Sequence, residues 1–179
     1  NCHIEPYAEH VVSAFEAGRL MMGPKLGAEL KKGEIVVKTD DTMARHQQRV
    51  AYFQYQAEKT KLDSDIELTY AEKQAEVKEA GYRDAADANQ KVKNAVSPNM
   101  LRQRLFEWQA AKLGIEKSEH DMAITEAGAE VKLAEYEAAK TMVGRHEITL
   151  EVSGVVQEVF KHEGEWVTPG EPIAKLTQL

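Results

Sequence analysis

Hydrophobic and polar positions follow one pattern at the two ends of the chain and another between them. Residues 1–41 and 144–179 hold short apolar runs separated by glycines, which is typical of short antiparallel strands. Residues 42–95 contain one glycine and no proline, and they are rich in Ala, Glu, Lys, Gln and Arg, all good helix formers. The pattern therefore predicts two β segments with a long helical segment between them.

The turn residues place the strands within the two β segments. Each segment offers few apolar side chains, too few to bury a core of its own, so one shared core is expected. Strands are predicted over residues 9–15, 18–22, 34–39, 147–152, 155–160, 166–167 and 172–176. The side chains expected in the shared core are Leu30, Val36, Val152, Val155, Val167 and Ile173.

The helical segment is predicted to form two long helices. An Asp or Thr within residues 40–42 can cap the first helix, which is expected to end at residue 94 or 95. Ser97 before Pro98 is a strong start signal for the second helix, and Gly144 is expected to stop it. Two long helices joined by so short a turn must run antiparallel, as a hairpin.

Each helix has an apolar stripe that is expected to face the other helix. The steps of three and four residues are those of a coiled-coil seam. In the second helix the stripe comprises Leu101, Leu105, Trp108, Ala111, Ile115, Met122, Thr125, Ala129, Leu133 and Tyr136. In the first it comprises Met43, Val50, Phe53, Ala57, Leu62, Ile66 and Tyr70.

A twelve-residue pattern occurs once in each β segment, as GAELKKGEIVVK (27–38) and as GEWVTPGEPIAK (164–175). The matched pairs are Gly27 with Gly164, Leu30 with Val167, Gly33 with Gly170, Glu34 with Glu171, Val36 with Ile173, and Lys38 with Lys175. Two similar halves can cover each other's apolar face. We therefore predict an α+β fold in which residues 42–143, with a tip near 94–98, form an antiparallel coiled-coil hairpin. This hairpin is inserted between two halves of one β sandwich, residues 1–41 and 144–179.

Composition excludes several classes of protein. The net charge of −7 argues against nucleic acid as a partner, because phosphate binding needs a basic surface. The chain contains no run of 18 apolar residues, which is about the length needed to span a membrane. The chain begins with Asn1 and Cys2 rather than Met, so a processed product or a piece of a longer protein is expected. Cys2 can be read as a lipidated cysteine or as a free thiol, and Asn1 in front of it favours the thiol.

No pattern of reactive side chains indicates an enzyme. The six histidines, at positions 3, 10, 46, 120, 146 and 162, are scattered, so a zinc or copper site is not expected. No nucleophile motif and no phosphate-binding glycine loop occurs. We therefore expect no catalytic, cofactor-binding or metal site.

The glycine spacing of each half resembles that of biotinyl/lipoyl carrier domains, which are flattened sandwiches of two quasi-symmetric halves. A lipoyl-like sandwich split by a helical hairpin resembles the periplasmic adaptor, or membrane fusion, proteins of the HlyD type. The second half, LEVSGVVQEVFKHEGEWVTPGEPIAKL (150–176), is similar to that family over its whole length. The first half departs from it at residues 21–24, where it is one residue shorter between its glycines.

The resemblance implies a periplasmic adaptor subunit of an efflux or secretion system, without covalent chemistry. Its partners would be an inner-membrane exporter, an outer-membrane channel protein reached by the hairpin tip, and further copies of itself in a ring formed through the lipoyl-like domains. It would lie in the periplasm, anchored to the inner membrane by residues outside this chain. The family's tip pattern has a Ser at the turn, which Ser97 matches, and an Arg and a Leu late in the first helix, which this chain lacks. The residues expected to contact the channel are Lys93, Asn94, Val96, Ser97, Asn99 and Met100.

The sequence is compatible with alternatives on three points. Ser97 can be a helix cap alone or a cap that also docks. The chain can alternatively be a carrier domain acylated on Lys38, or a purely structural coiled-coil spacer. Gly81 and Gly114 lie at similar distances from the turn, roughly 25 Å at 1.5 Å per residue, so they are expected at one level of the hairpin as a possible hinge or as ordinary surface residues.

Overall fold

The computed structural model describes residues 8–178, so the prediction for Cys2 lies outside the described residues. The chain divides into two compact units. One comprises Asn1–Tyr52 with Ala134–Leu179, and the other comprises Phe53–Leu133. The α+β fold is confirmed, because the first unit holds two antiparallel sheets and the second is entirely helical apart from its turns.

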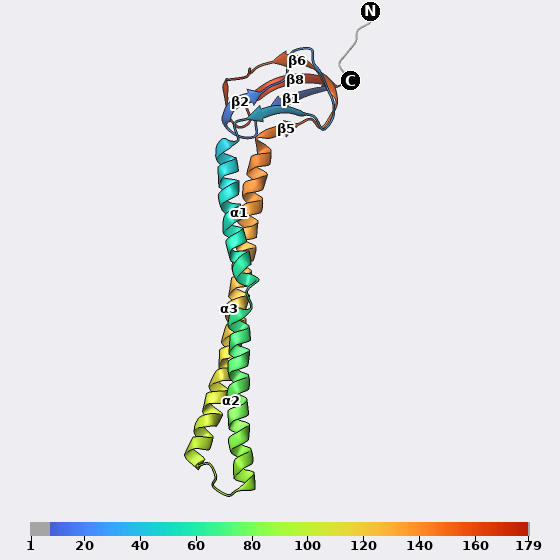
Figure 1. The fold of residues 1–179 in the computed structure, drawn as a ribbon. Coiled ribbons are helices and arrows are strands. Elements are labelled where there is room, and N and C mark those ends of the chain that lie inside the picture. The colour runs from blue at the N-terminus through green and yellow to red at the C-terminus, as the bar shows by residue number, and fades with distance from the viewer. Residues whose placement is uncertain (1–7, 179) are drawn as a thin grey trace, which may run out of the picture. The chain divides into compact units, whose positions relative to one another are not determined.

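The two sheets have four strands each, and both take strands from both ends of the chain (Figure 1). One sheet has the order β1-β8-β6-β3 and the other the order β5-β4-β2-β7. Exchanging β1–β4 for β5–β8 converts one order into the other, so the sandwich has a quasi-twofold relation between its halves. The strands are β1 Glu9–Ser13, β2 Gly18–Met22, β3 Glu29–Leu30, β4 Ile35–Thr39, β5 Glu147–Thr149, β6 Gly154–Val159, β7 Trp166–Val167 and β8 Pro172–Gln178.

The repeated twelve-residue pattern encodes a repeated backbone conformation. Its four glycines, Gly27, Gly33, Gly164 and Gly170, are the glycines with positive φ in the described chain, from 75° to 92°. That region is costly for residues with a Cβ atom. The two matched glutamates also play the same part, because each carboxylate accepts a hydrogen bond from the backbone N–H three residues earlier, Glu34 at 3.1 Å and Glu171 at 2.9 Å.

The core lies between the two sheets and follows the prediction for four of the six residues. Leu30, Val36, Val167 and Ile173 are buried, as expected. Val155 and Val152 are only partly buried, so their assignment to the core was wrong. Strand β6 begins at Gly154, and because side chains alternate along a strand, Val156 rather than Val155 faces the core.

Three helices, rather than two, lie between β4 and β5: α1 Thr42–Leu62, α2 Ile66–Lys91 and α3 Pro98–Arg145. A continuous first helix was therefore the wrong expectation, because residues 63–65 interrupt it. Asp and Ser compete with helix formation by bonding nearby backbone groups, and the interruption has the sequence Asp-Ser-Asp. Gly144 lies in the last turn of α3, one residue before the helix ends.

The inward faces of the helices differ in size of side chain. All ten stripe residues predicted for α3 are partly or fully buried, which confirms that stripe. Most of the stripe predicted for the first helix is wrong, because five of its members are between 57% and 72% exposed: Met43, Val50, Phe53, Ile66 and Tyr70. Leu62 is partly buried, as expected. Buried alanines take their place: Ala44, Ala71, Ala75 and Ala85. Small side chains let two helices approach closely, so the larger apolar residues of α1 and α2 are left on the outer surface.

Candidate functional site

The tip of the hairpin is the loop between α2 and α3, and Asn89 holds its main chain. The side-chain amide of Asn89 donates to the carbonyl of Val96 at 3.0 Å, and the N–H of Val96 donates to the Asn89 side-chain oxygen at 2.7 Å. Both bonds are partly buried. One side chain of α2 thus satisfies both backbone groups of Val96 and fixes the loop against the helix.

The rest of the loop is held by backbone bonds and by a helix cap. The N–H of Ala95 donates to the Val92 carbonyl at 3.1 Å, and Asn94 has a φ of 62°, a conformation that Asn tolerates. The hydroxyl of Ser97 accepts from the N–H of Met100 at 3.3 Å, as an N-cap does. The capping role of Ser97 is therefore confirmed, and its docking role stays a prediction.

The six residues predicted for docking all lie in this loop or in the first turn of α3. Val96 is partly buried, and the other five, Lys93, Asn94, Ser97, Asn99 and Met100, are exposed. Sequence reasoning missed Asn89, whose role depends on a contact seven residues further along the chain. It also missed Val92, which is 63% exposed beside the predicted residues, and Arg102, which donates to the Asn99 side chain at 3.2 Å.

Positive charge is concentrated at the tip. Residues 88–106 contain Lys91, Lys93, Arg102 and Arg104 and no acidic residue. Arg104 donates to the Gly81 carbonyl at 2.8 Å, and none of the four forms an ion pair within the described chain. Just below the tip, Lys78 pairs with Glu107 at 2.8 Å, and this bond is the main reason why the pKa of Glu107 is lowered.

The two glycines proposed as a hinge do not lie at one level. Gly81 lies opposite Arg104, whose guanidinium contacts it, and a Cβ atom at Gly81 would lie 3.4 Å from that group. The neighbouring Tyr82 stacks on Trp108, with ring centroids 5.7 Å apart, so Gly81 lies at the level of residues 104–108 of α3. Gly114 lies six to ten residues further along α3, about 9–15 Å away at 1.5 Å per residue, with open space beside it. The argument from a shared level was wrong, and bending at either glycine stays a prediction.

Lys38, the candidate for acylation in a carrier domain, is held in a cluster of charged side chains. Its ammonium group lies 2.6 Å from a Glu147 carboxylate oxygen and 3.6 Å from Asp41. Arg45 contacts the same Asp41 carboxylate at 2.7 Å. The bond to Glu147 raises the pKa of Lys38, and it holds the ammonium group against β5 rather than at the end of an exposed turn. This environment disfavours the carrier interpretation.

The described residues offer little for other chemistry. Within residues 8–178, no three His, Cys, Asp or Glu side chains gather in a way that could hold a metal ion. His146 is buried and lies with its Nδ1 2.8 Å from the Thr39 hydroxyl, in a structural contact between β4 and the start of β5. None of the helices that the structure describes is apolar over enough of its length to cross a membrane.

The arrangement of sandwich and hairpin is found in solved structures. No family model matches the chain, and no curated protein matches it in sequence. MacA from Actinobacillus actinomycetemcomitans is similar with a TM-score of 0.69 and 18% identity, over 98% of this chain and 51% of MacA. The soluble domain of LipC, a membrane fusion protein of a type I secretion system, gives a TM-score of 0.57 and 12% identity, over 96% of this chain and 100% of that domain.

The periplasmic adaptor protein EmrA gives a TM-score of 0.51 and 15% identity, over 97% of this chain and 73% of EmrA. This chain therefore spans about half the length of MacA and about three quarters of that of EmrA. At these identities the likeness concerns the fold. The fold of the chain is that of the HlyD-type periplasmic adaptor, or membrane fusion, proteins.

Proposed function

We propose that this chain is the lipoyl-like and hairpin part of a periplasmic adaptor in an efflux or secretion system. It links an inner-membrane exporter to an outer-membrane channel protein, and residues outside the chain anchor it to the inner membrane. The observation that carries the proposal is the split sandwich, in which a long hairpin is inserted between β4 and β5 while strands from both sides share each sheet. A free-standing carrier domain or a simple coiled coil has no need of this arrangement.

The hairpin tip is the proposed contact with the channel protein. Its backbone is fixed by Asn89 and Ser97, so most side chains of the loop are not used to hold the fold. Val92 and Met100, which are 63% and 49% exposed, offer apolar surface there. A rigid loop with exposed apolar and basic side chains suits docking, because little conformational entropy is lost on binding.

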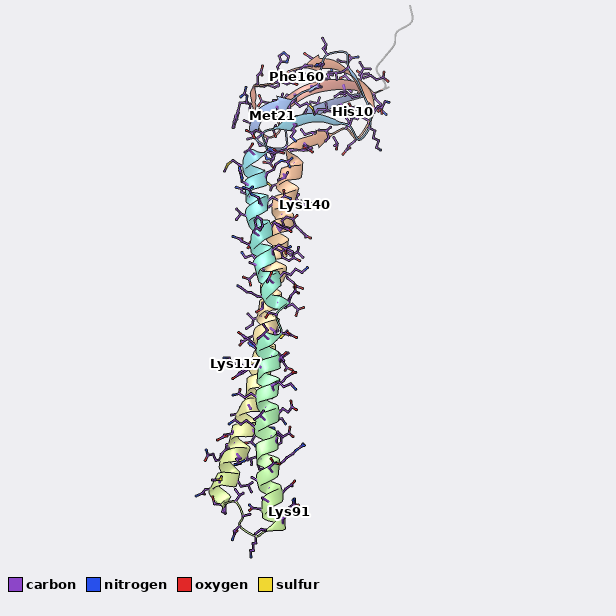
Figure 2. The ribbon with its side chains drawn as sticks, in the orientation of Figure 1. His10, Met21, Lys91, Lys117, Lys140 and Phe160 are labelled. Atoms are coloured by element: carbon purple, nitrogen blue, oxygen red, sulfur yellow. The ribbon has the colours of Figure 1, made fainter. Side chains whose placement is uncertain are left out.

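The sandwich is the proposed contact between adaptor copies in a ring. Large apolar side chains remain on its outer surface, among them Met21 at 56%, Leu26 at 71% and Trp166 at 65% exposed. Figure 2 shows Met21 and Phe160 on this part of the chain. Side chains of this size are commonly covered at interfaces between proteins.

Co-purification from the native host tests the function. The full-length protein, tagged and cross-linked in cells, should bring down an exporter and a channel protein. Deletion of residues 42–143 should abolish recovery of the channel protein and leave recovery of the exporter unchanged. Recovery of neither partner would favour the spacer interpretation, and biotin or lipoate on Lys38, detected by mass spectrometry, would favour the carrier.

A further inference from the structure

The charge of the tip is opposite to that of the rest of the chain. Residues 88–106 carry a charge of +4 within a chain of net charge −7, so the remaining residues carry −11. Four cations elsewhere in the helical unit pair with a carboxylate at 2.6–2.8 Å: Lys61 with Glu58, Lys73 with Glu76, Lys78 with Glu107 and Arg83 with Glu79. Lys59 and Lys117 form no ion pair among the described residues, but they directly follow Glu58 and Glu116 in the sequence, whereas no acidic residue lies within 88–106. The tip cations form no such pairs within the described residues.

Neither helix end at the tip carries an acidic side chain that could balance the cations. The first turn of α3 contains no acidic residue, and Arg102 and Arg104 follow within the second turn. A helix N-terminus favours acidic side chains and disfavours cations. Lys91 is favourably placed at the C-terminal end of α2, but it lies beside Lys93, and both are exposed.

We propose that the hairpin tip recognises an acidic rim on the channel protein, with Lys91, Lys93 and Arg102 facing carboxylates around an apolar contact made by Val92 and Met100. This inference rests on the proposed function and names the chemistry of the partner at the same site. Complementary charge steers association and fixes register, whereas the apolar centre supplies much of the affinity. Arg104 is oriented by the Gly81 carbonyl and adds to the field of the tip.

A photo-crosslinking amino acid in place of Val92, in the full-length protein in its native host, tests the proposal. The same amino acid is placed at Met100 in a second variant, so that a folding or expression defect of the Val92 variant does not decide the result. The charge variant is Lys91→Glu with Lys93→Glu. The matched control is Lys117→Glu with Lys140→Glu, which makes the same change of charge on exposed side chains of α3 that Figure 2 shows away from the tip.

We expect the cross-linked peptide to come from a channel protein and to be rich in Asp and Glu. The tip variant should lower the cross-linking yield about tenfold, since like charges then face each other, and the control should leave it unchanged. Replacing the identified carboxylates by Lys should restore the yield with the tip variant. A channel peptide without acidic residues, or a yield insensitive to the tip variant, overturns the acidic rim and leaves the proposed function intact.

Two further outcomes separate the remaining interpretations. If neither position cross-links to a channel protein and none co-purifies, the proposed function fails together with the inference. The purified chain is also mixed with vesicles of phosphatidylcholine containing phosphatidylglycerol. Co-sedimentation that the tip variant abolishes and the control does not would mean that the cations bind lipid headgroups, which overturns the acidic rim. We expect no such co-sedimentation at 150 mM salt, where charges are screened within about 8 Å.

Discussion

At the scale of single residues, Asn89 is the side chain on which the geometry of the tip depends. Replacing it by Ala removes two hydrogen bonds and leaves both backbone groups of Val96 without their partner. We expect a loss of about 1–2 kcal/mol in the free energy of unfolding and faster hydrogen exchange at the Val96 amide. The control is Asn99→Ala, which removes one exposed bond. Equal effects of the two substitutions would contradict the role of Asn89.

Asp41 gives a prediction for the dependence of stability on pH. Its pKa is lowered from 3.8, chiefly by the hydrogen bond from Arg45. Because the unfolded chain takes up a proton at higher pH than the folded chain, the stabilisation is complete above the unfolded pKa. It is lost as the pH falls from about 4 through the lower pKa of the folded state.

The measurement is urea unfolding between pH 7 and pH 2. Asp41→Asn should lower the free energy of unfolding at pH 7 and flatten its decline below pH 4. Asp87→Asn, at an exposed position of α2, serves as the control and should change neither value. A wild-type decline retained in Asp41→Asn would show that other carboxylates are responsible.

The sequence predicts the tip residues better than the contacts that hold them. Ser97 and Pro98 mark the start of α3 by local chemistry, so the position of the tip can be found without a structure. The bond between Asn89 and Val96 depends on how the loop folds back on the helix, which residue types and spacing do not encode. Asn is a poor helix former, and its place near the end of α2 is the one signal that pointed to it.

At the scale of helices, the α3 stripe was predictable and the α1–α2 stripe was not. In α3 large apolar side chains recur at coiled-coil spacing and face inward. In α1 and α2 the inward positions are largely alanines, whose small apolar area hardly stands out from the frequent alanines elsewhere in these helices. Reading the large side chains as the seam therefore assigned them to the wrong face. The Asp-Ser-Asp interruption is visible in the sequence, because both residue types compete with helix formation.

Leucines of α3 test this assignment of faces. Leu105→Ala and Leu133→Ala each remove a partly buried side chain from the seam, whereas Leu113→Ala removes one that is 63% exposed. We expect losses on the order of 1–2 kcal/mol for the first two, below the 2–5 kcal/mol of a fully buried site. Leu113→Ala should lie within about 0.5 kcal/mol of the wild type. Thermal or chemical unfolding gives the free energy of unfolding of all three variants. A larger loss for Leu113→Ala than for the other two would mean that Leu113, rather than Leu105 and Leu133, faces the first two helices.

The glycines of the helices give a second test. Gly114 has open space around its missing Cβ atom, and Gly81 would place its Cβ in ordinary contact with Arg104. Gly114→Ala should therefore raise the free energy of unfolding by up to about 1 kcal/mol, and Gly81→Ala by less. If the double variant is more stable and export by the intact system falls, the glycines serve bending. If export is unchanged, they are ordinary surface positions.

At the scale of the whole molecule, the sandwich is expected to fold without the hairpin. Its core is lined by strands from both ends of the chain and includes none of the helix residues. Removing residues 42–143 and joining the ends by a short turn should leave a cooperatively folding domain with dispersed amide resonances in NMR. The same deletion without the β1 segment, residues 8–17, is the control and should be disordered. Disorder in both would contradict the proposed division into 1–41, 42–143 and 144–179.

The exchange of strands between the two halves has a consequence for the order of folding. No sheet is complete until β5–β8 have joined β1–β4, and the contact of Lys38 with Glu147 spans 109 residues. Closing a flexible loop of that length costs about 4 kcal/mol in chain entropy before any strand pairs. A helical hairpin forms through local contacts that start at its turn and extend along the two helices, and this brings its two ends together. Most of the chain entropy is therefore lost in small steps, each offset by the contacts of one more helical turn. Refolding of the sandwich should accordingly slow when the seam is weakened, and slow little when the hairpin is replaced by a short turn.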